Sequence, residues 1–212
     1  CVLTASAQDK KDMFNPERTS VTSQSIAPDA RAGGMGDIGA ATDPDVASQY
    51  WNPAKYPFTI SRAGVSLNYT PWLRQLVNDI DLAYLVGYYR IGDYSAVSGS
   101  LRYFSLGEVM TSESDDAMTI NPYEMSIDVA YSLMLSEHFS LGAAVRWIYS
   151  DLSDKYSDDT KPGSAFAADL SCYYQNYLNI GSRECQLGLG LNISNIGSKI
   201  TMGTDDRSEF LP

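Results

Sequence analysis

The stretch from Gly34 to Gly39, GMGDIG, has the G-x-G-x-x-G spacing with which a turn between a strand and a helix binds the pyrophosphate of a dinucleotide. That chemistry needs a strand before the glycines, a helix after them and an acidic residue about 20 positions further on to bind a ribose hydroxyl. Here no β-branched apolar run precedes Gly34, and Pro44 would interrupt a helix. No Asp or Glu lies between Asp45 and Asp79. The glycines therefore need an explanation other than nucleotide binding.

Other residues that could act as nucleophiles, bases or metal ligands are few. The one histidine, His138, lies in the turn-like stretch SEHF, where we expect it to be exposed, and no G-x-S-x-G motif is present. The three cysteines have no metal-ligand spacing. Cys172 and Cys185 flank a predicted turn near Leu178, so they could form a disulfide across a hairpin or serve as small apolar side chains. We therefore predict no enzyme activity and no catalytic, cofactor-binding or metal-binding residues.

The composition argues against a nucleic-acid partner and favours a membrane. The formal net charge is −11, whereas a nucleic-acid-binding protein needs a basic face. Only 19% of the residues are charged and 15 are tyrosine, yet no stretch reaches the roughly 18 apolar residues of a membrane-spanning helix. This combination is typical of a transmembrane β-barrel, in which apolar residues occupy alternate positions.

The first residues look like the end of an export signal. Ala5-Ser6-Ala7 has the small-x-small form of a signal-peptidase site, and a polar stretch begins at Gln8. We therefore predict that residues 1–7 are the remnant of a signal peptide and that cleavage follows Ala7. The alternative is that Cys1 is the first residue of a mature, lipid-bearing chain.

Apolar and polar residues alternate from residue 59 onward. In YEMSIDVAYSLML, in FSLGAAVRWIYS and in the run from Cys185, one parity is apolar and the other holds mainly Ser, Gly, Ala, Asn and Gln. Because side chains of a strand alternate between its two faces, each segment has one apolar and one polar face. The apolar parity predicts a lipid-facing wall made of Ile127, Val129, Tyr131, Leu133, Val145, Trp147, Leu187, Leu189 and Leu191.

The alternation predicts an all-β fold, a transmembrane antiparallel up-and-down β-barrel. A soluble sandwich would also alternate, but with strands of about five or six residues and more Lys and Glu on its polar face. Short connections such as SEHF alternate here with long acidic ones, as the periplasmic turns and external loops of outer-membrane barrels do. The predicted strands lie at 59–70, 80–91, 94–105, 123–135, 138–150, 164–177 and 184–196.

An odd number of strands cannot close such a barrel, since unpaired backbone groups in lipid cost several kcal/mol each. We therefore expect a chain truncated at 212, in which residues 59–212 form the first half of the barrel. Residues 8–58 are assigned to an N-terminal periplasmic or plug segment, whose small residues allow close packing inside the lumen. The predicted plug motif consists of Gly33, Gly34, Gly36, Gly39, Asp43, Pro44, Asn52, Pro53 and Ala54.

Three stretches carry a resemblance to a known family: SIAPDARAGGMGDIGAATDPDVASQYWNPAKYPF, VAYSLMLSEHFSLGAAVRWIYSDL and GLGLNISNIGSKI. Together they resemble the FadL-like superfamily of outer-membrane barrels, and more closely its PorV family, an outer-membrane component of the type IX secretion system. The resemblance implies a barrel of about fourteen strands, of which about half are present. It also implies location in the outer membrane of a Gram-negative-type cell, with a periplasmic N-terminus and extracellular long loops.

The same resemblance implies a non-enzymatic shuttle role. Such proteins take cargo that carries a C-terminal secretion domain from the outer-membrane translocon. They deliver it to a sortase-like attachment complex, which joins it to anionic lipopolysaccharide. The alternative is a FadL-like transporter of hydrophobic small molecules, for which we expect an apolar pocket near the plug. Acidic residues of the long connections could meet basic cargo or divalent ions, or simply keep the loops solvated: Glu113, Asp115, Asp116, Asp151, Asp154, Asp158 and Asp159.

Overall fold

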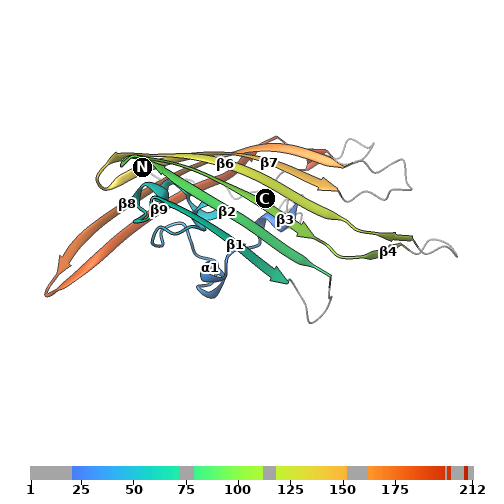
Figure 1. Ribbon diagram of the computed structural model, residues 1–212, viewed down its shortest axis with the longest axis horizontal. Coiled ribbons are helices and arrows are strands. Elements are labelled where there is room, and N and C mark those ends of the chain that lie inside the picture. The colour runs from blue at the N-terminus through green and yellow to red at the C-terminus, as the bar shows by residue number, and fades with distance from the viewer. Residues whose placement is uncertain are drawn as a thin grey trace, which may run out of the picture.

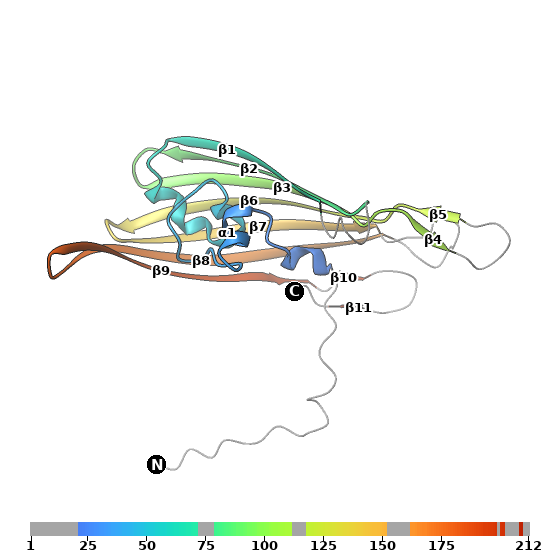
Figure 2. The same cartoon turned by 90° about the horizontal axis from the view of Figure 1, so that it is seen from below.

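A computed structural model describes residues 21–71, 79–111, 118–151, 162–198, 200–201 and 208–209 of the chain. Its main feature is a seven-stranded antiparallel sheet in the order β1-β2-β3-β6-β7-β8-β9, curled into a half-barrel (Figures 1 and 2). Neighbours in the sheet follow one another along the chain, which confirms the predicted up-and-down architecture. The strands are β1 (Ala63–Pro71), β2 (Asp81–Ile91), β3 (Ser95–Ser105), β6 (Tyr123–Ser136), β7 (Phe139–Asp151), β8 (Gly163–Ile180) and β9 (Arg183–Gly197).

Two pairs of short strands lie within connections for which the sequence pattern predicts loops. β4 (Val109–Thr111) pairs with β5 (Met118–Ile120), and β10 (Ile200–Thr201) pairs with β11 (Ser208–Glu209). Strands of two or three residues contain no repeated alternation, so hydrophobic periodicity could not predict them.

Two strand boundaries differ from the prediction. β1 begins at Ala63 rather than at 59, because residues Pro53–Phe58 form a 3₁₀ helix, η3, and Thr59 caps its end. β8 continues to Ile180, and its turn contains Gly181 with a φ of +65°, a conformation that glycine adopts readily. The β8–β9 hairpin therefore turns later than predicted.

This longer hairpin decides the state of the cysteines. Cys172 is opposite Leu191, and Cys185 is opposite Leu178, so the two cysteines do not face each other. Both are free thiols. The predicted possibility of a disulfide across the hairpin is therefore wrong, because the real turn lies several residues beyond the predicted one.

The two faces of the sheet differ as the alternation predicted. Val129 and Val145 are each 62% exposed on the convex face, and Leu189 is 56% exposed. Of the other residues predicted for this wall, Ile127, Tyr131, Leu133, Leu187 and Leu191 are exposed and Trp147 is half-buried. The opposite, concave parity is buried. It is apolar along β2, at Leu82, Tyr84, Val86 and Tyr88, and on the following strands it also holds many polar residues: Ser98, Ser100, Arg102, Ser126, Asp128, Ser132, Ser140, Arg146, Asp169 and Ser171.

The N-terminal segment lies on the concave side of the half-barrel (Figure 2). It consists of short helices joined by turns, and Tyr56 of η3 stacks on Tyr88 of β2 with ring centroids 4.7 Å apart. Among the described residues, no helix is both long and apolar enough to cross a membrane. The helices are η2 (Thr22–Ser25), α1 (Ala30–Gly34), α2 (Ser48–Trp51) and η3 (Pro53–Phe58).

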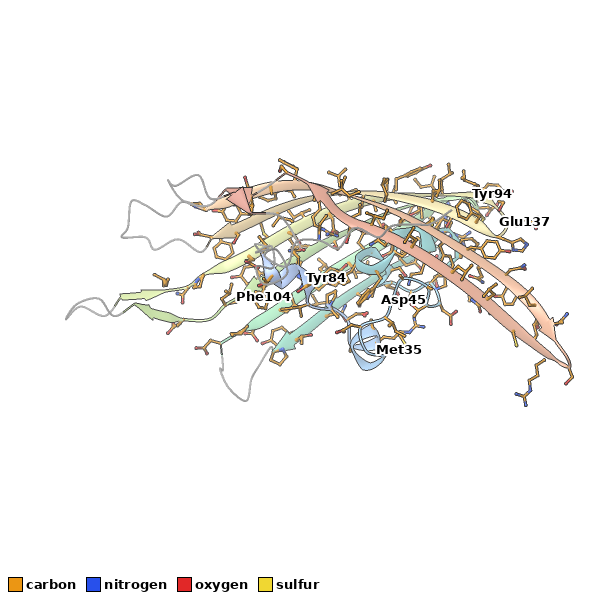
Figure 3. The ribbon with its side chains drawn as sticks, turned by 180° about the vertical axis from the view of Figure 1, so that it is seen from behind. Met35, Asp45, Tyr84, Tyr94, Phe104 and Glu137 are labelled. Atoms are coloured by element: carbon orange, nitrogen blue, oxygen red, sulfur yellow. The ribbon has the colours of Figure 1, made fainter. Side chains whose placement is uncertain are left out.

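The short turns of the sheet gather at one end. Tyr94 and Glu137, which belong to the β2–β3 and β6–β7 turns, mark this end in Figure 3. The β8–β9 hairpin extends beyond the other turns there (Figure 1). β7 pairs with β8 only as far as Tyr174, so the last residues of β8 pair with β9 alone.

Candidate functional site

The interface between the N-terminal segment and the concave wall contains several buried polar contacts. Asn52, whose side chain is completely buried, donates from Nδ2 to the carbonyl oxygens of Ala40 and Cys172, each at 2.9 Å. Its Oδ1 accepts from the backbone N–H of Ala54 at 3.0 Å, the capping contact that starts η3. Pro53 follows as the first helical residue, where a missing N–H is tolerated. One amide thus joins η3, strand β8 and the turn formed by residues 39–42, called the glycine-rich turn below.

The backbone of η3 is bound to β6 and β7. Ser132 Oγ donates to the carbonyl of Pro53 at 2.7 Å, and Ser140 Oγ donates to the carbonyl of Ala54. Gly142 of β7 lies opposite Ser132, and a Cβ atom at Gly142 would come within 2.9 Å of the Ala54 nitrogen. Serine hydroxyls and a glycine therefore let the N-P-A backbone lie directly on the wall, as the prediction of a docked segment requires.

Strand β9 contacts the glycine-rich turn at Ala40 and Ala41. A Cβ atom at Gly188 would lie 2.8 Å from the Ala41 carbonyl oxygen, and one at Gly190 would overlap the Ala40 carbonyl. These wall glycines belong to the polar parity of β9, and the sequence pattern did not identify them as part of the site. Their recurrence on one face was the available signal.

The predicted glycines of the N-terminal segment play unequal roles. Gly39 lies against the Trp51 ring, where a Cβ atom would come within 2.6 Å of Cδ1. Gly33, Gly34 and Gly36 have no atom of the described residues within 4 Å of such a Cβ, and Gly36 adopts a φ of +80°. Close packing therefore accounts for Gly39, and a turn conformation for Gly36.

The two remaining predicted positions, Asp43 and Pro44, lie in the loop that follows the glycine-rich turn. Asp43 Oδ1 accepts from Gln186 Nε2 of β9 at 3.0 Å. Pro44 beside it is half-buried. Arg31 of α1 forms an ion pair with Asp45 at 2.6 Å, which holds the loop to the helix.

Lys55 is a buried cation that the sequence analysis missed. Its side chain is buried within the segment, and Nζ donates to the Gly39 carbonyl at 2.7 Å and to Thr42 Oγ1 at 3.2 Å. Burial, which disfavours the charged form, lowers the pKa of Lys55 to about 8. Because both acceptors lie in the glycine-rich turn, this lysine fixes the turn to η3.

A network of charged residues lies deeper in the concave wall. Arg146 of β7 donates from Nε to Asp128 Oδ2 at 3.1 Å and from Nη2 to Asp169 Oδ2 at 2.8 Å. Its Nη1 donates to Asn195 Oδ1 at 2.6 Å. Gln49 of α2 joins the network by donating to Asp128 Oδ1 at 3.3 Å. The N-terminal segment is thus connected to buried charges on three neighbouring strands.

The network coincides with a β-bulge. The register of β8 and β9 shifts between Ala168 and Leu170, and Asn195 adopts a φ of +59°. Asp169 lies in the shift and accepts the Asn195 backbone N–H at 2.7 Å. Its carboxylate therefore compensates for the ladder bond that the bulge removes.

Arg102 of β3 holds the start of the described chain. Its Nη2 donates to the carbonyl oxygens of Ser23 and Ile26, the latter at 2.8 Å, and its guanidinium lies 5.6 Å from the centroid of the Tyr50 ring. Tyr50 in turn donates to the Gln24 carbonyl at 2.9 Å. The segment is therefore attached to the wall at both ends.

An open hollow lies beside the glycine-rich turn. It has a volume of about 490 Å³, and apolar side chains from Ile38, Ala40, Ala41 and Trp51 contribute most of its lining. Ile38 is 57% exposed.

Several predicted positions lie elsewhere. His138 is exposed, as expected, and its Nδ1 lies 3.0 Å from the Gln175 carbonyl oxygen. Within the described ranges no group of three or more His, Cys, Asp or Glu side chains is arranged to bind a metal ion. Asp151 ends β7. Ala7 lies outside the described residues, and so do the remaining acidic loop positions: Glu113, Asp115, Asp116, Asp154, Asp158 and Asp159.

A half-barrel with an exposed apolar convex face, and with a concave face that buries charged residues beneath its own N-terminal segment, defines a protein of the outer-membrane β-barrel class. The family described as "Type IX secretion system protein PorV" matches residues 8–212, and the chain belongs to that family. It is therefore an outer-membrane component of the type IX secretion system. No curated protein matches the chain.

Proposed function

We propose that the protein is a non-enzymatic shuttle of the type IX secretion system. It binds secreted cargo through the C-terminal secretion domain, takes it from the outer-membrane translocon and delivers it to the sortase-like attachment complex at the cell surface. There the cargo is joined to lipopolysaccharide. The assignment is supported by membership of the PorV family over residues 8–212.

The filled concave face supports a role on the outside of the barrel rather than a wide channel. Asn52, Lys55 and Gln49 are all buried, and each donates to a carbonyl, hydroxyl or carboxylate oxygen. A folded cargo domain cannot pass through a lumen that is occupied in this way. We therefore assign the contacts with partners to the rim and to the long external connections, which partners outside the cell meet first.

The proposal includes an orientation and a processing step. The end with the short turns and the N-terminal segment face the periplasm, the long connections face outward, and the exposed convex residues contact lipid. Residues 1–7 are removed after Ala7, residues 8–58 form the plug, and residues 59–212 contribute strands to the wall.

A second candidate function is transport of a hydrophobic small molecule. The hollow beside Trp51 favours it, because its volume of about 490 Å³ lies within the usual range of small-molecule sites. Replacing Ile38 by Asp would place a charge in this hollow. That variant should impair uptake of an apolar compound if transport is the function, and should leave cargo delivery unchanged if secretion is.

Deletion of the complete gene followed by cell fractionation tests the proposal. We expect cargo to accumulate in the periplasm, with its secretion domain uncleaved and no lipopolysaccharide attached. Complementation with the wild-type gene is the matched control. Normal surface delivery of cargo in the deletion strain would overturn the shuttle role, and impaired lipid uptake in the same strain would then support transport.

A further inference from the structure

A polar hollow separate from the plug interface lies at the end of the sheet that carries the short turns. It has a volume of about 300 Å³ and is lined by Ile60, Arg62, Arg90, Gly92 and Asp93. These residues come from the approach to β1, the end of β2 and the β2–β3 turn. Two guanidinium groups and one carboxylate therefore share one recess at the rim of the wall.

The two arginines are positioned by different contacts. Arg90 donates from Nη1 to the Thr59 carbonyl at 2.6 Å, and its buried Nε has no hydrogen-bond partner among the described residues. Arg62 is exposed, and its guanidinium lies 5.5 Å from the centroid of the Tyr89 ring. Arg90 Nη2 also donates to the Asp93 carbonyl at 3.4 Å. One cation is thus fixed by backbone carbonyls beside the recess, and the other lies over an aromatic ring. Two such groups match a phosphate oxyanion.

The surroundings of the recess indicate the source of that phosphate. Ile60 is completely exposed, and Tyr89 and Ile91 are 46% and 50% exposed on the convex apolar face. Arg90, between them in the chain, has the concave parity of buried Tyr88, whereas Arg62 lies over the Tyr89 ring and so connects the recess to the convex face. A basic recess connected in this way to the margin of an apolar wall fits a membrane lipid, whose chains contact the wall while its headgroup enters the recess. A soluble phosphate would not need the apolar margin.

The carboxylate of Asp93 narrows the choice of headgroup. Asp93 is exposed at the turn and lines the recess with both arginines. A headgroup that carries only negative charge would meet this carboxylate without compensation. A primary ammonium group beside the phosphodiester would satisfy it as a hydrogen-bond donor.

We propose that this recess binds the headgroup of phosphatidylethanolamine, with the phosphodiester on Arg62 and Arg90 and the ammonium on Asp93. The inference rests on the membrane placement given under the proposed function, but not on transfer of cargo. The proposed lipid is bound beside the β2–β3 turn, at the periplasmic boundary of the membrane.

The test uses the full-length protein, extracted from the outer membrane and exchanged into nanodiscs with equal amounts of dioleoyl phosphatidylethanolamine, phosphatidylglycerol and phosphatidylcholine. Native mass spectrometry then counts the lipids that stay bound. We expect wild-type protein to retain phosphatidylethanolamine preferentially, and Arg62→Gln to reduce this retention by about tenfold through loss of a charge-assisted contact. Asp93→Asn should reduce retention of phosphatidylethanolamine but not of phosphatidylglycerol.

Arg183→Gln is the matched control, because Arg183 is exposed at the same end of the sheet but outside the recess. Unchanged phosphatidylethanolamine retention by Arg62→Gln, an equal loss from Arg183→Gln, or an Asp93→Asn variant that loses both lipids alike would each overturn the proposal. Failure of the membrane placement would appear earlier and differently, as wild-type protein recovered outside the outer-membrane fraction.

Discussion

Replacing Asn52 by alanine removes the one side chain that joins the glycine-rich turn, η3 and β8. The substitution deletes three buried hydrogen bonds, to the Ala40 carbonyl, the Cys172 carbonyl and the Ala54 N–H. Each buried group left without a partner costs about 1–3 kcal/mol. Partial relaxation and entry of water reduce the sum, so we expect the docked segment to lose about 3–4 kcal/mol relative to the undocked state.

Lys55 provides the assay for this loss. It is the P1 residue that trypsin needs to cut the bond to Tyr56, and it is only 1% exposed while the segment is docked. A loss of about 3–4 kcal/mol raises the population of the undocked state by about two to three orders of magnitude. The initial rate of cleavage between Lys55 and Tyr56, measured by mass spectrometry on folded protein in detergent, should rise accordingly.

Asn68→Ala is the matched control, since Asn68 is a half-buried asparagine of β1 whose Nδ2 donates to Ser66 Oγ of the same strand at 3.3 Å, away from the N-terminal segment. This variant should cleave at the wild-type rate. If Asn52→Ala also keeps Lys55 protected while the barrel stays folded, the amide does not hold the segment and the reasoning fails.

Three further predictions concern charge and lipid. Burial lowers the pKa of Lys55 to about 8, so the docked state loses this proton more readily than the undocked state. Docking should therefore strengthen as the pH rises from about 8 toward 10.5, and hydrogen exchange of residues 39–42 should show this. A Lys55→Met variant with the same dependence of docking on pH would contradict it. Arg146→Met leaves two carboxylates buried and should destabilise the wall by about 3–5 kcal/mol in a urea titration. The additional changes Asp128→Asn and Asp169→Asn should restore most of the loss, and no recovery would argue against the network. Val129→Arg or Val145→Arg should each destabilise the barrel by about 2–4 kcal/mol near the bilayer centre. Each should reduce the heat-modifiable folded band in outer-membrane fractions, whereas Val129→Leu should not. Normal insertion of both arginine variants would contradict the assignment of the convex face to lipid.

The strands could be predicted because a repeat of two is visible within each segment. β6, for example, was expected at 123–135 and extends from Tyr123 to Ser136. The alternation also separated Val129, which is exposed, from Asp128, which is buried. It could not indicate that Asp128 shares Arg146 with Asp169, because that contact depends on the register of three strands.

The candidate site was predictable only in its local part. Asn52, Pro53 and Ala54 were assigned to the plug motif, but the helix that they begin was not predicted, although Asn at the N-cap and Pro at the first helical position are residues typical of a helix start. Long-range partners such as Cys172 and the glycines of β9 have no local signal near Asn52. The turn of the β8–β9 hairpin was misplaced because the strand was expected to end at 177, whereas β8 continues to Ile180.

The separation between Asn52 and its partner on β8 imposes an order on biogenesis. The two residues are 120 positions apart, and the strands between them must be paired before the Cys172 carbonyl reaches its final place. Contacts of this range form late, because closing the intervening chain costs entropy that only the finished sheet offsets. Immobilisation of the N-terminal segment is thus a checkpoint that reports a correctly registered wall, and a folding factor that recognises the loose segment would recognise unfinished molecules.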